Sequence, residues 1–284
     1  MFELTDVRKE QILVLGSNGF LGHNVCTYLR SLDYKVYGLN QRSKVSHSFQ
    51  ITMTELIANY QEYNFATAIF CGNPPISENE DDYFAETFFS DLKNANILKD
   101  LGFNKVIWTG SYWQDFVEQG LKEETLYTKS KRLTEESLLA LADDSFRVAS
   151  IRLGDTYGAN DSRGKIIPQM ISALKKKELF TVKQPNSYMN LVSIVDVARG
   201  FEHVASSHSP VQQIYSVYAD SLTSVKDLIT EFNRVFPNFK YEITNSEQNF
   251  DLRSSFNLGI YPKPNNWTPK ISLEEGLRNL KLID

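Results

Sequence analysis

The sequence predicts an α/β fold with a doubly wound parallel sheet and a smaller α+β lobe at its C-terminal end. Short apolar runs alternate with stretches whose apolar residues recur at helical spacing, a pattern typical of a parallel sheet covered by helices on both faces. The 284 residues are 42% hydrophobic, enough to bury a sizeable core in one large or two modest domains. The alternation weakens after about residue 155, so we expect domains at 1–155 and 156–284, with segments near 190–220 returning to the first.

The first half supplies the predicted sheet. Continuous apolar runs bounded by turn residues predict its strands, in chain order, at 11–15, 34–39, 65–71, 105–109 and 147–153. Apolar residues three and four apart predict the helices between them, at about 21–32, 84–98 and 126–142.

The second half is less regular and contains more loops. Helices are predicted at 166–174, 224–236 and 272–280, and strands at 179–183, 190–195, 213–218 and 239–243. Directly after the predicted strand 190–195, Asp196 is expected to cap a helix that starts at Val197. Four of the nine prolines fall between residues 236 and 269, which favours a small lobe rich in loops.

Composition excludes several classes of protein. The formal net charge is −5, whereas a nucleic-acid or membrane-surface binder needs a basic excess. Two cysteines, Cys26 and Cys71, are too few for a disulfide framework or a Cys-rich zinc site, and the four histidines lack metal-ligand spacing. No apolar run approaches the roughly 18–20 residues of a membrane span, and the first residues lack the apolar core of a signal peptide. We expect a cytoplasmic protein without a metal ion.

A glycine-rich loop joins the first predicted strand to the first helix. It consists of Gly16, Ser17, Asn18, Gly19, Phe20, Leu21 and Gly22. Glycines here let the backbone turn tightly and approach a pyrophosphate, and the helix N-terminus offers free N–H groups and a partial positive charge. The spacing G-x-x-G-x-x-G differs from the G-x-G-x-x-G fingerprint, but strand and helix flank it as a dinucleotide-binding Rossmann-type domain requires.

The end of the second predicted strand bears on the choice of dinucleotide. An enzyme that prefers NAD usually places an acidic residue here to bind the ribose 2′-hydroxyl, but this chain has Asn40. Arg42 follows and could meet a 2′-phosphate, so the sequence favours NADP(H) as the cofactor, with NAD(H) as the alternative. The simpler interpretation of Asn40 and Arg42 is that they belong to a solvated polar loop.

Tyr127 and Lys131 lie four residues apart on the long predicted helix and therefore share one face. An ammonium group beside a phenol favours the phenolate, so such a tyrosine can give a proton to a carbonyl that is being reduced. Chance alone predicts about one such pair in a chain of this composition, so the spacing by itself is weak evidence. The support comes from the place of the pair, on the helix after the strand 105–109 in a chain that opens with a glycine-rich loop. Ser111, just beyond the strand 105–109, could orient the substrate oxygen; Thr109 is a rival, and an ordinary turn serine is the bland alternative.

In order, these motifs resemble the extended short-chain dehydrogenases/reductases of the NAD-dependent epimerase/dehydratase type, which act on nucleotide sugars. The resemblance covers nearly the whole chain and rests on GSNGFLG at 16–22, VIWTGS at 106–111, YTKSK at 127–131, IRLGDTYG at 151–158, GKIIPQMISAL at 164–174, NLVSIVDVARG at 190–200 and WTPKISLEEGL at 267–277. It implies a Rossmann domain at 1–155 and a substrate-binding lobe at 156–284. It also implies a catalytic triad of Ser111, Tyr127 and Lys131, with Lys131 holding the nicotinamide ribose and the glycines lining the pyrophosphate.

Departures from the family pattern narrow the expected reaction. Dehydratases of this family carry Thr-Asp-Glu where this chain has Ser111, Tyr112 and Trp113, so the carboxyl pair for eliminating water is missing. The resemblance then implies an NADPH-dependent reductase of a 4-keto-(6-deoxy) nucleotide sugar, in deoxysugar or cell-surface polysaccharide biosynthesis such as that of lipopolysaccharide O-antigen. The alternatives are an NAD-dependent nucleotide-sugar epimerase and, in another class, a non-catalytic NAD(P)-sensing protein.

Substrate contacts are less specific in the sequence. Trp113 could wall a sugar pocket, although core packing explains it equally well. Arg163, Lys165 and Arg253 lie in the expected substrate lobe and could bind a diphosphate, with a solvated surface role as the alternative. The resemblance also suggests a homodimer formed through two helices, one of them carrying Tyr127.

Overall fold

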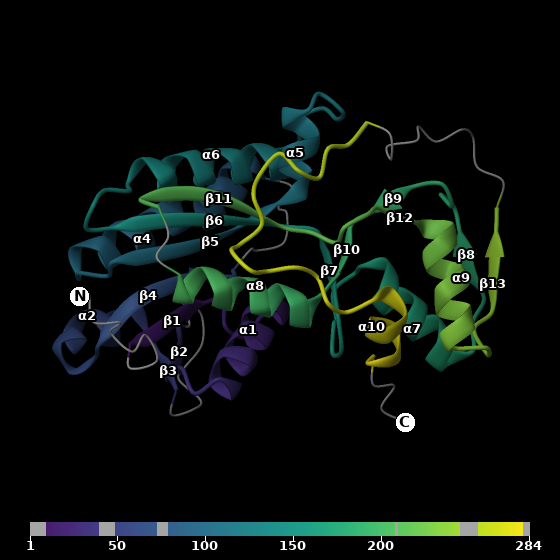
Figure 1. Cartoon of the computed structure of the whole chain (residues 1–284), viewed down its shortest axis with the longest axis horizontal. Coiled ribbons are helices and arrows are strands. Elements are labelled where there is room, and N and C mark those ends of the chain that lie inside the picture. The colour runs from purple at the N-terminus through teal and green to yellow at the C-terminus, as the bar shows by residue number, and fades with distance from the viewer. Residues whose placement is uncertain (1–9, 40–48, 73–78, 208–209, 245–254, 281–284) are drawn as a thin grey trace. The chain divides into compact units, whose positions relative to one another are not determined.

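A seven-stranded sheet forms the centre of the first of two units into which the chain divides (Figure 1). The computed structural model describes residues 10–39, 49–72, 79–207, 210–244 and 255–280. The first unit comprises Met1–Leu153, Ala198–Ser216 and Tyr261–Trp267, and the second comprises Gly154–Val197, Val217–Ile260 and Thr268–Asp284.

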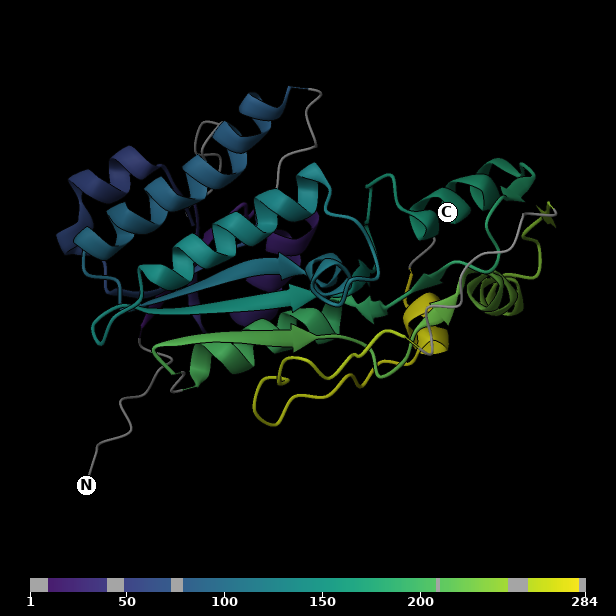
Figure 2. The same cartoon turned by 90° about the horizontal axis from the view of Figure 1, so that it is seen from above.

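The sheet has the strand order β11-β6-β5-β4-β1-β2-β3. Its strands are β1 (Gln11–Leu15), β2 (Lys35–Leu39), β3 (Gln50–Ile51), β4 (Phe65–Phe70), β5 (Lys105–Ser111), β6 (Arg147–Leu153) and β11 (Gln212–Val217). The pairs from β3 through to β6 are parallel, and in Figure 2 the arrows of β5, β6 and β11 point the same way. The order reverses between β1 and β4, which confirms the predicted doubly wound sheet.

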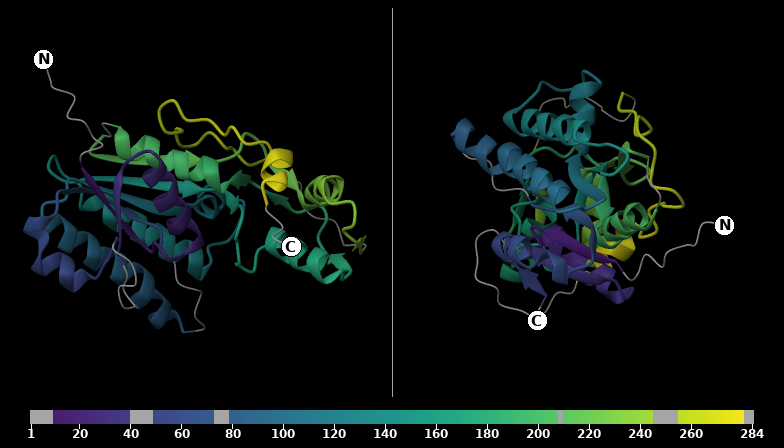
Figure 3. Two further views of the ribbon diagram at one scale, coloured as in Figure 1. Left: turned by 90° about the horizontal axis from the view of Figure 1, so that it is seen from below. Right: turned by 90° about the vertical axis from the view of Figure 1, so that its left-hand side faces the viewer.

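Helices cover both faces of this sheet, as Figures 2 and 3 show. Helices α4 (Ser90–Asp100) and α6 (Leu126–Ala140) lie on one face, and α1 (Phe20–Ser31) and α8 (Ile194–Ser206) lie on the other. Every residue of β1, β4 and β5 is buried, which explains why these strands read as continuous apolar runs. The strands pack with α4 and α6 through one apolar cluster that includes Leu13, Phe70, Leu98, Val106 and Leu138.

Shorter elements complete the first unit. They are α2 (Met53–Ala58), the 3₁₀ turn η2 (Tyr60–Glu62), α3 (Glu80–Phe84), the π-helical turn η3 (Ala85–Phe89) and α5 (Tyr112–Glu118). Helix α3, η3 and α4 follow one another without a break.

Among its described residues, the second unit contains three small two-stranded sheets and three helices. Its strands pair as β7 (Asp155–Tyr157) with β10 (Leu191–Ser193), β8 (Phe180–Val182) with β13 (Tyr241–Ile243), and β9 (Tyr188–Met189) with β12 (Thr223–Ser224). The helices are α7 (Ile166–Lys176), α9 (Val225–Val235) and α10 (Leu273–Arg278). They bury a separate core around Met170, Leu228, Ile229, Phe232 and Leu277.

The prediction for residues 190–197 is wrong in one respect. Strand β10 stops at Ser193, whose Oγ accepts a hydrogen bond from the Val195 N–H (3.3 Å), and α8 already begins at Ile194. Asp196 therefore lies in the first helical turn instead of capping it, and one of its carboxylate oxygens accepts the N–H groups of Lys270 and Ile271 at 3.0 and 2.9 Å.

Across the described residues, no helix has both the length and the apolar character needed to cross a membrane.

Candidate active site

The carboxyl ends of β1, β4 and β5 meet at one edge of the sheet, because these neighbouring strands are parallel. The glycine-rich loop follows β1, Gly72 lies just after β4, and Ser111 is the last residue of β5. The reversal of strand order lies between β1 and β4, the place where open α/β sheets bind their ligands.

The glycine-rich loop is closely packed and leaves no room for a side chain at Gly16 or Gly22. Gly16 has φ of +77°, and a Cβ there would lie 2.5 Å from the Gly72 nitrogen. A Cβ on Gly22 would lie 2.3 Å from the Gly16 carbonyl oxygen. Helix α1 begins after Gly19, which has no side chain with which to cap the first N–H groups of the helix. This cradle fits the pyrophosphate of a dinucleotide.

The other residues of this loop lie as follows. Ser17 is buried, Asn18 is exposed, and Phe20 and Leu21 are partly buried in the first turn of α1. The Asn18 Oδ1 accepts a hydrogen bond from Gln50 of the edge strand β3 (2.8 Å). Asn40 and Arg42, on which the preference for NADP(H) depends, lie outside the described residues.

Helix α6 carries Tyr127 and Lys131 on one face, as their spacing predicts. Its N-terminus is fixed by a Thr125 cap, whose side chain accepts the Thr128 N–H. Tyr127 is partly buried, whereas Lys131 is 5% exposed and donates from Nζ to the Thr109 carbonyl oxygen at 2.8 Å. The same ammonium group lies 4.5 Å from the centre of the Trp108 ring. Burial lowers the pKa of Lys131 to about 8, so the group is still mostly charged near neutral pH.

Ser111 ends β5 and caps α5. Its Oγ accepts the Trp113 N–H at 3.3 Å, and its own backbone N–H donates to the Gln114 side chain at 2.9 Å. The rival Thr109 uses its hydroxyl to donate to the Phe70 carbonyl of β4 at 2.6 Å. The Thr109 hydroxyl is thus engaged inside the sheet, whereas the Ser111 hydroxyl lies at the carboxyl end of β5.

Sequence reasoning missed a buried charge cluster directly behind these residues. Arg152 of β6 is 1% exposed and donates to Asp115 and Glu118 of α5, each at 2.6 Å, and to Glu135 of α6. Gln114 donates to Glu135 as well, at 3.1 Å. The cluster ties α5 and α6 to β6. It therefore fixes the helix that Ser111 caps and the helix that carries Tyr127 and Lys131. An arginine inside the apolar run RVASIRL was the signal for it in the sequence.

Trp113 lies in an aromatic group at the start of α5. Its ring centre is 5.4 Å from those of Tyr112 and Phe116, and the Lys122 ammonium lies 4.4 Å above it. Trp113 is only partly buried, in contrast to Tyr112 and Phe116.

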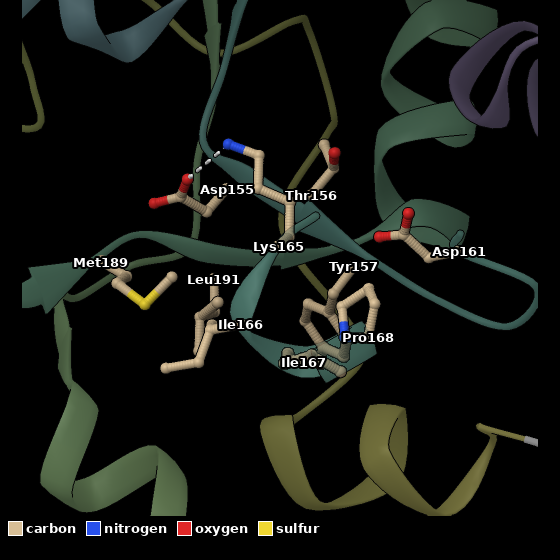
Figure 4. Close-up of a pocket in the computed structure, with 10 residues that line it drawn as sticks. All are labelled: Asp155, Thr156, Tyr157, Asp161, Lys165, Ile166, Ile167, Pro168, Met189 and Leu191. Carbon is tan, nitrogen blue, oxygen red and sulfur yellow. Dashed lines mark ion pairs between the residues drawn. The ribbon is translucent and has the colours of Figure 1, made fainter. Parts of the chain in front are cut away.

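Two of the predicted substrate cations lie beside a pocket of the second unit, shown in Figure 4. The pocket is lined by Asp155, Thr156, Tyr157, Asp161, Lys165, Ile166, Ile167, Pro168, Met189 and Leu191. The ammonium of Lys165 points toward Asp155 at 4.0 Å and is largely exposed. Arg163 is held by Asp161 through two hydrogen bonds of 2.8 Å and by the Thr156 carbonyl. Arg253 lies outside the described residues.

Solved structures with this fold match nearly the whole chain. A UDP-glucose 4-epimerase from Thermotoga maritima, solved with UDP-glucose, superposes with a TM-score of 0.77 over 95% of this chain and 96% of its own, at 17% identity. A dTDP-glucose 4,6-dehydratase from Bacillus anthracis, solved with NAD, gives 0.74 over 95% and 94%, at 16% identity. At these identities the likeness shows the fold.

Sequence comparison places the chain in a family. A CDP-abequose synthase from Yersinia pseudotuberculosis is 25% identical over 144 residues, so the match spans about half of each protein (50% of this chain and 51% of the relative). The model of the NAD dependent epimerase/dehydratase family matches residues 12–217, which include the glycine-rich loop, Ser111, Tyr127 and Lys131. The chain therefore belongs to the NAD dependent epimerase/dehydratase family.

Proposed function

We propose that this protein is an NADPH-dependent reductase of a 4-keto-6-deoxy nucleotide sugar, with Ser111, Tyr127 and Lys131 at the reacting carbonyl. The contact between the Lys131 ammonium and the Thr109 carbonyl oxygen carries the proposal. It sets the face of α6 that bears Tyr127 against the end of β5, two residues before Ser111.

Each residue has one role in this proposal. Tyr127 gives its phenolic proton to the alkoxide that forms when the keto carbon is reduced. Lys131 stabilises the resulting phenolate by its charge and binds the nicotinamide ribose. Ser111 donates a hydrogen bond that orients the carbonyl. The loop Gly16–Gly22 and the N-terminus of α1 hold the pyrophosphate of the dinucleotide, which supplies the hydride when it is bound.

The surroundings of Ser111 favour reduction over dehydration. Elimination of water needs a free acid and a free base beside the sugar, but Tyr112 and Trp113 occupy the two positions after Ser111 where dehydratases of this family carry Asp and Glu. The nearest acids on α5, Asp115 and Glu118, are both engaged by Arg152. A reductase needs only a hydride and one proton, which Tyr127 can supply.

Other parts of the proposal rest on the sequence and on the relative. The relative with which this chain shares a quarter of the aligned residues is a CDP-abequose synthase, so its product is a sugar linked to a nucleotide. Asn40 and Arg42 support NADPH as the reductant. We further propose that the second unit binds the substrate, with Lys165, Arg163 and Arg253 near its diphosphate and Trp113 near the sugar, and that the protein works as a homodimer.

The test is to offer the protein NADPH and a panel of 4-keto-6-deoxy nucleotide sugars. Reduction is measured as the loss of NADPH absorbance, and the product is then identified. Tyr127→Phe should lower kcat by about 10²–10⁴ and leave the Kd for NADPH unchanged. Tyr63→Phe, which removes a hydroxyl elsewhere in the first unit, should leave kcat unchanged. Retention of NAD⁺ through purification, with interconversion at C4 and no net use of NADPH, would instead identify an epimerase. Full cellular function of Tyr127→Phe would identify a sensor.

A further inference from the structure

Asp91 of α4 is joined to Lys131 through a tryptophan ring. The Trp108 indole Nε1 donates to the Asp91 Oδ2 at 2.8 Å, and the Lys131 ammonium lies 4.5 Å from the centre of the same ring. A carboxylate that accepts the indole N–H increases the electron density of the ring, and this strengthens the attraction between the ring face and a cation. Asp91 and Lys131 are thus linked by two contacts that reinforce each other.

The helix that carries Asp91 is fixed against the helix that carries Lys131. In the π-helical turn η3, the Thr87 Oγ lies 2.7 Å from the Oγ of Ser130, the residue before Lys131, and also donates to the Tyr83 carbonyl at 2.7 Å. Asp91 lies four residues after Thr87, so both face α6 and β5. π-Helical turns are often found at functional sites.

Three described groups of negative or potentially negative charge act on Lys131: Asp91 from α4, Glu135 from α6 and Cys71 after β4. Glu135 is bound to Arg152, whose positive charge offsets it. Burial raises the pKa of Cys71 well above its usual range, so this thiol is neutral at working pH. Asp91 is left as the charge that offsets the burial of the Lys131 ammonium.

We propose that Asp91 is a positioning residue that acts through the Trp108 indole to keep Lys131 in its charged form above the end of β5. The inference rests on the proposed function, because the ammonium of Lys131 matters there for Tyr127 and for the cofactor ribose. Asp91 itself does not touch substrate or cofactor.

The first test is Asp91→Asn, which keeps the size of the side chain and an acceptor for the Trp108 N–H but removes the charge. The pKa of Lys131 should fall by about one unit, because a neighbouring opposite charge favours the ammonium. The alkaline limb of kcat/KM for reduction should move to lower pH by the same amount, while kcat at pH 6.5 stays close to that of the wild type. Asp100→Asn, at the exposed end of the same helix, should move neither quantity.

The pKa of Lys131 can be read without turnover, from the ¹³Cε resonance of labelled lysine in the whole protein, assigned with Lys131→Met. Trp108→Phe is the second variant. It removes the N–H that Asp91 accepts and should shift the Lys131 pKa in the same direction. A shifted resonance without reduction of any substrate would support the role of Asp91 and count against the proposed reaction. Reduction with an unchanged Lys131 pKa in both variants would overturn the role of Asp91.

Discussion

Arg152 is a buried side chain whose charge is offset by three carboxylates. Asp115 and Glu135 are themselves 1% and 2% exposed, whereas Glu118 is 31% exposed. A buried ion pair is weak support for stability as such, but removal of one partner leaves buried charges uncompensated. Here the uncompensated groups would be carboxylates of α5 and α6.

Replacement of Arg152 by leucine should therefore lower the free energy of unfolding by about 3–5 kcal/mol, measured by urea denaturation. Arg132 provides a comparison, because it too is an arginine bound by carboxylates, Glu124 and Glu136, but its side chain is 34% exposed. Arg132→Leu should cost about 1 kcal/mol or less. Equal losses in the two variants would contradict the argument from burial.

The site shows which residues the sequence could reveal. Tyr127 and Lys131 follow from helical spacing, and Ser111 follows from its place after an apolar strand, since both signals are local. Arg152 and Asp91 depend on partners 17 to 37 positions away in the chain, namely Trp108 for Asp91 and the carboxylates Asp115, Glu118 and Glu135 for Arg152. Their charges could be read in the sequence, but their pairing required the packed sheet.

At the scale of elements, the C-terminal end of helix α8 is bound by a lysine of strand β5. Lys105, at the start of β5, is 8% exposed and donates from Nζ to the carbonyl oxygens of Val204, Ala205 and Ser207 at 3.3, 3.0 and 2.7 Å. The last carbonyls of a helix have no partners within it, and the helix dipole places partial negative charge there. Lys105 thus fastens the end of α8 to the sheet.

Lys105→Met keeps most of the apolar stem and removes these hydrogen bonds, so it should lower the free energy of unfolding by about 1–3 kcal/mol. Burial, with the charge of Arg147, lowers the pKa of Lys105 to about 8 from 10.5. Between these pH values the unfolded chain binds more protons at this residue than the folded one, so rising pH favours the folded state. The advantage of the wild type over Lys105→Met should accordingly grow from pH 8 to pH 10 in urea titrations. An advantage that stays constant over this range would contradict the lowered pKa.

Long elements could be predicted from periodicity, whereas some of the short ones could not. The buried strands are unbroken apolar runs and the amphipathic helices α1 and α7 have clear apolar faces, so periodicity reveals both. Helices α2 and α5 have only six and seven residues, too few for a period to appear. Each nevertheless begins with a capping box, Thr52 with Glu55 and Ser111 with Gln114, a signal that was present in the sequence and not used.

At the scale of the whole molecule, the chain builds two units that have separate cores. The first core includes Leu98 of α4, and the second includes Leu228 of α9; both side chains are fully buried. The chain passes between the units five times, at residues 153/154, 197/198, 216/217, 260/261 and 267/268. All three tryptophans, Trp108, Trp113 and Trp267, belong to the first unit. Their fluorescence therefore reports the first unit, whereas far-ultraviolet circular dichroism reports both.

Leu228→Ala should remove about 2–5 kcal/mol from the second core and leave the first intact. We expect part of the dichroism to be lost at a lower urea concentration than the change in tryptophan fluorescence, because separate cores can unfold separately. Leu98→Ala is the matched control, since the same truncation in the first core should move the fluorescence transition itself. If Leu228→Ala instead shifts both signals together, the repeated crossings of the chain have coupled the two cores into one cooperative unit. The segments 154–197 and 217–260 would then owe part of their stability to having both ends fixed by the first unit, which lowers the entropy that they gain on unfolding.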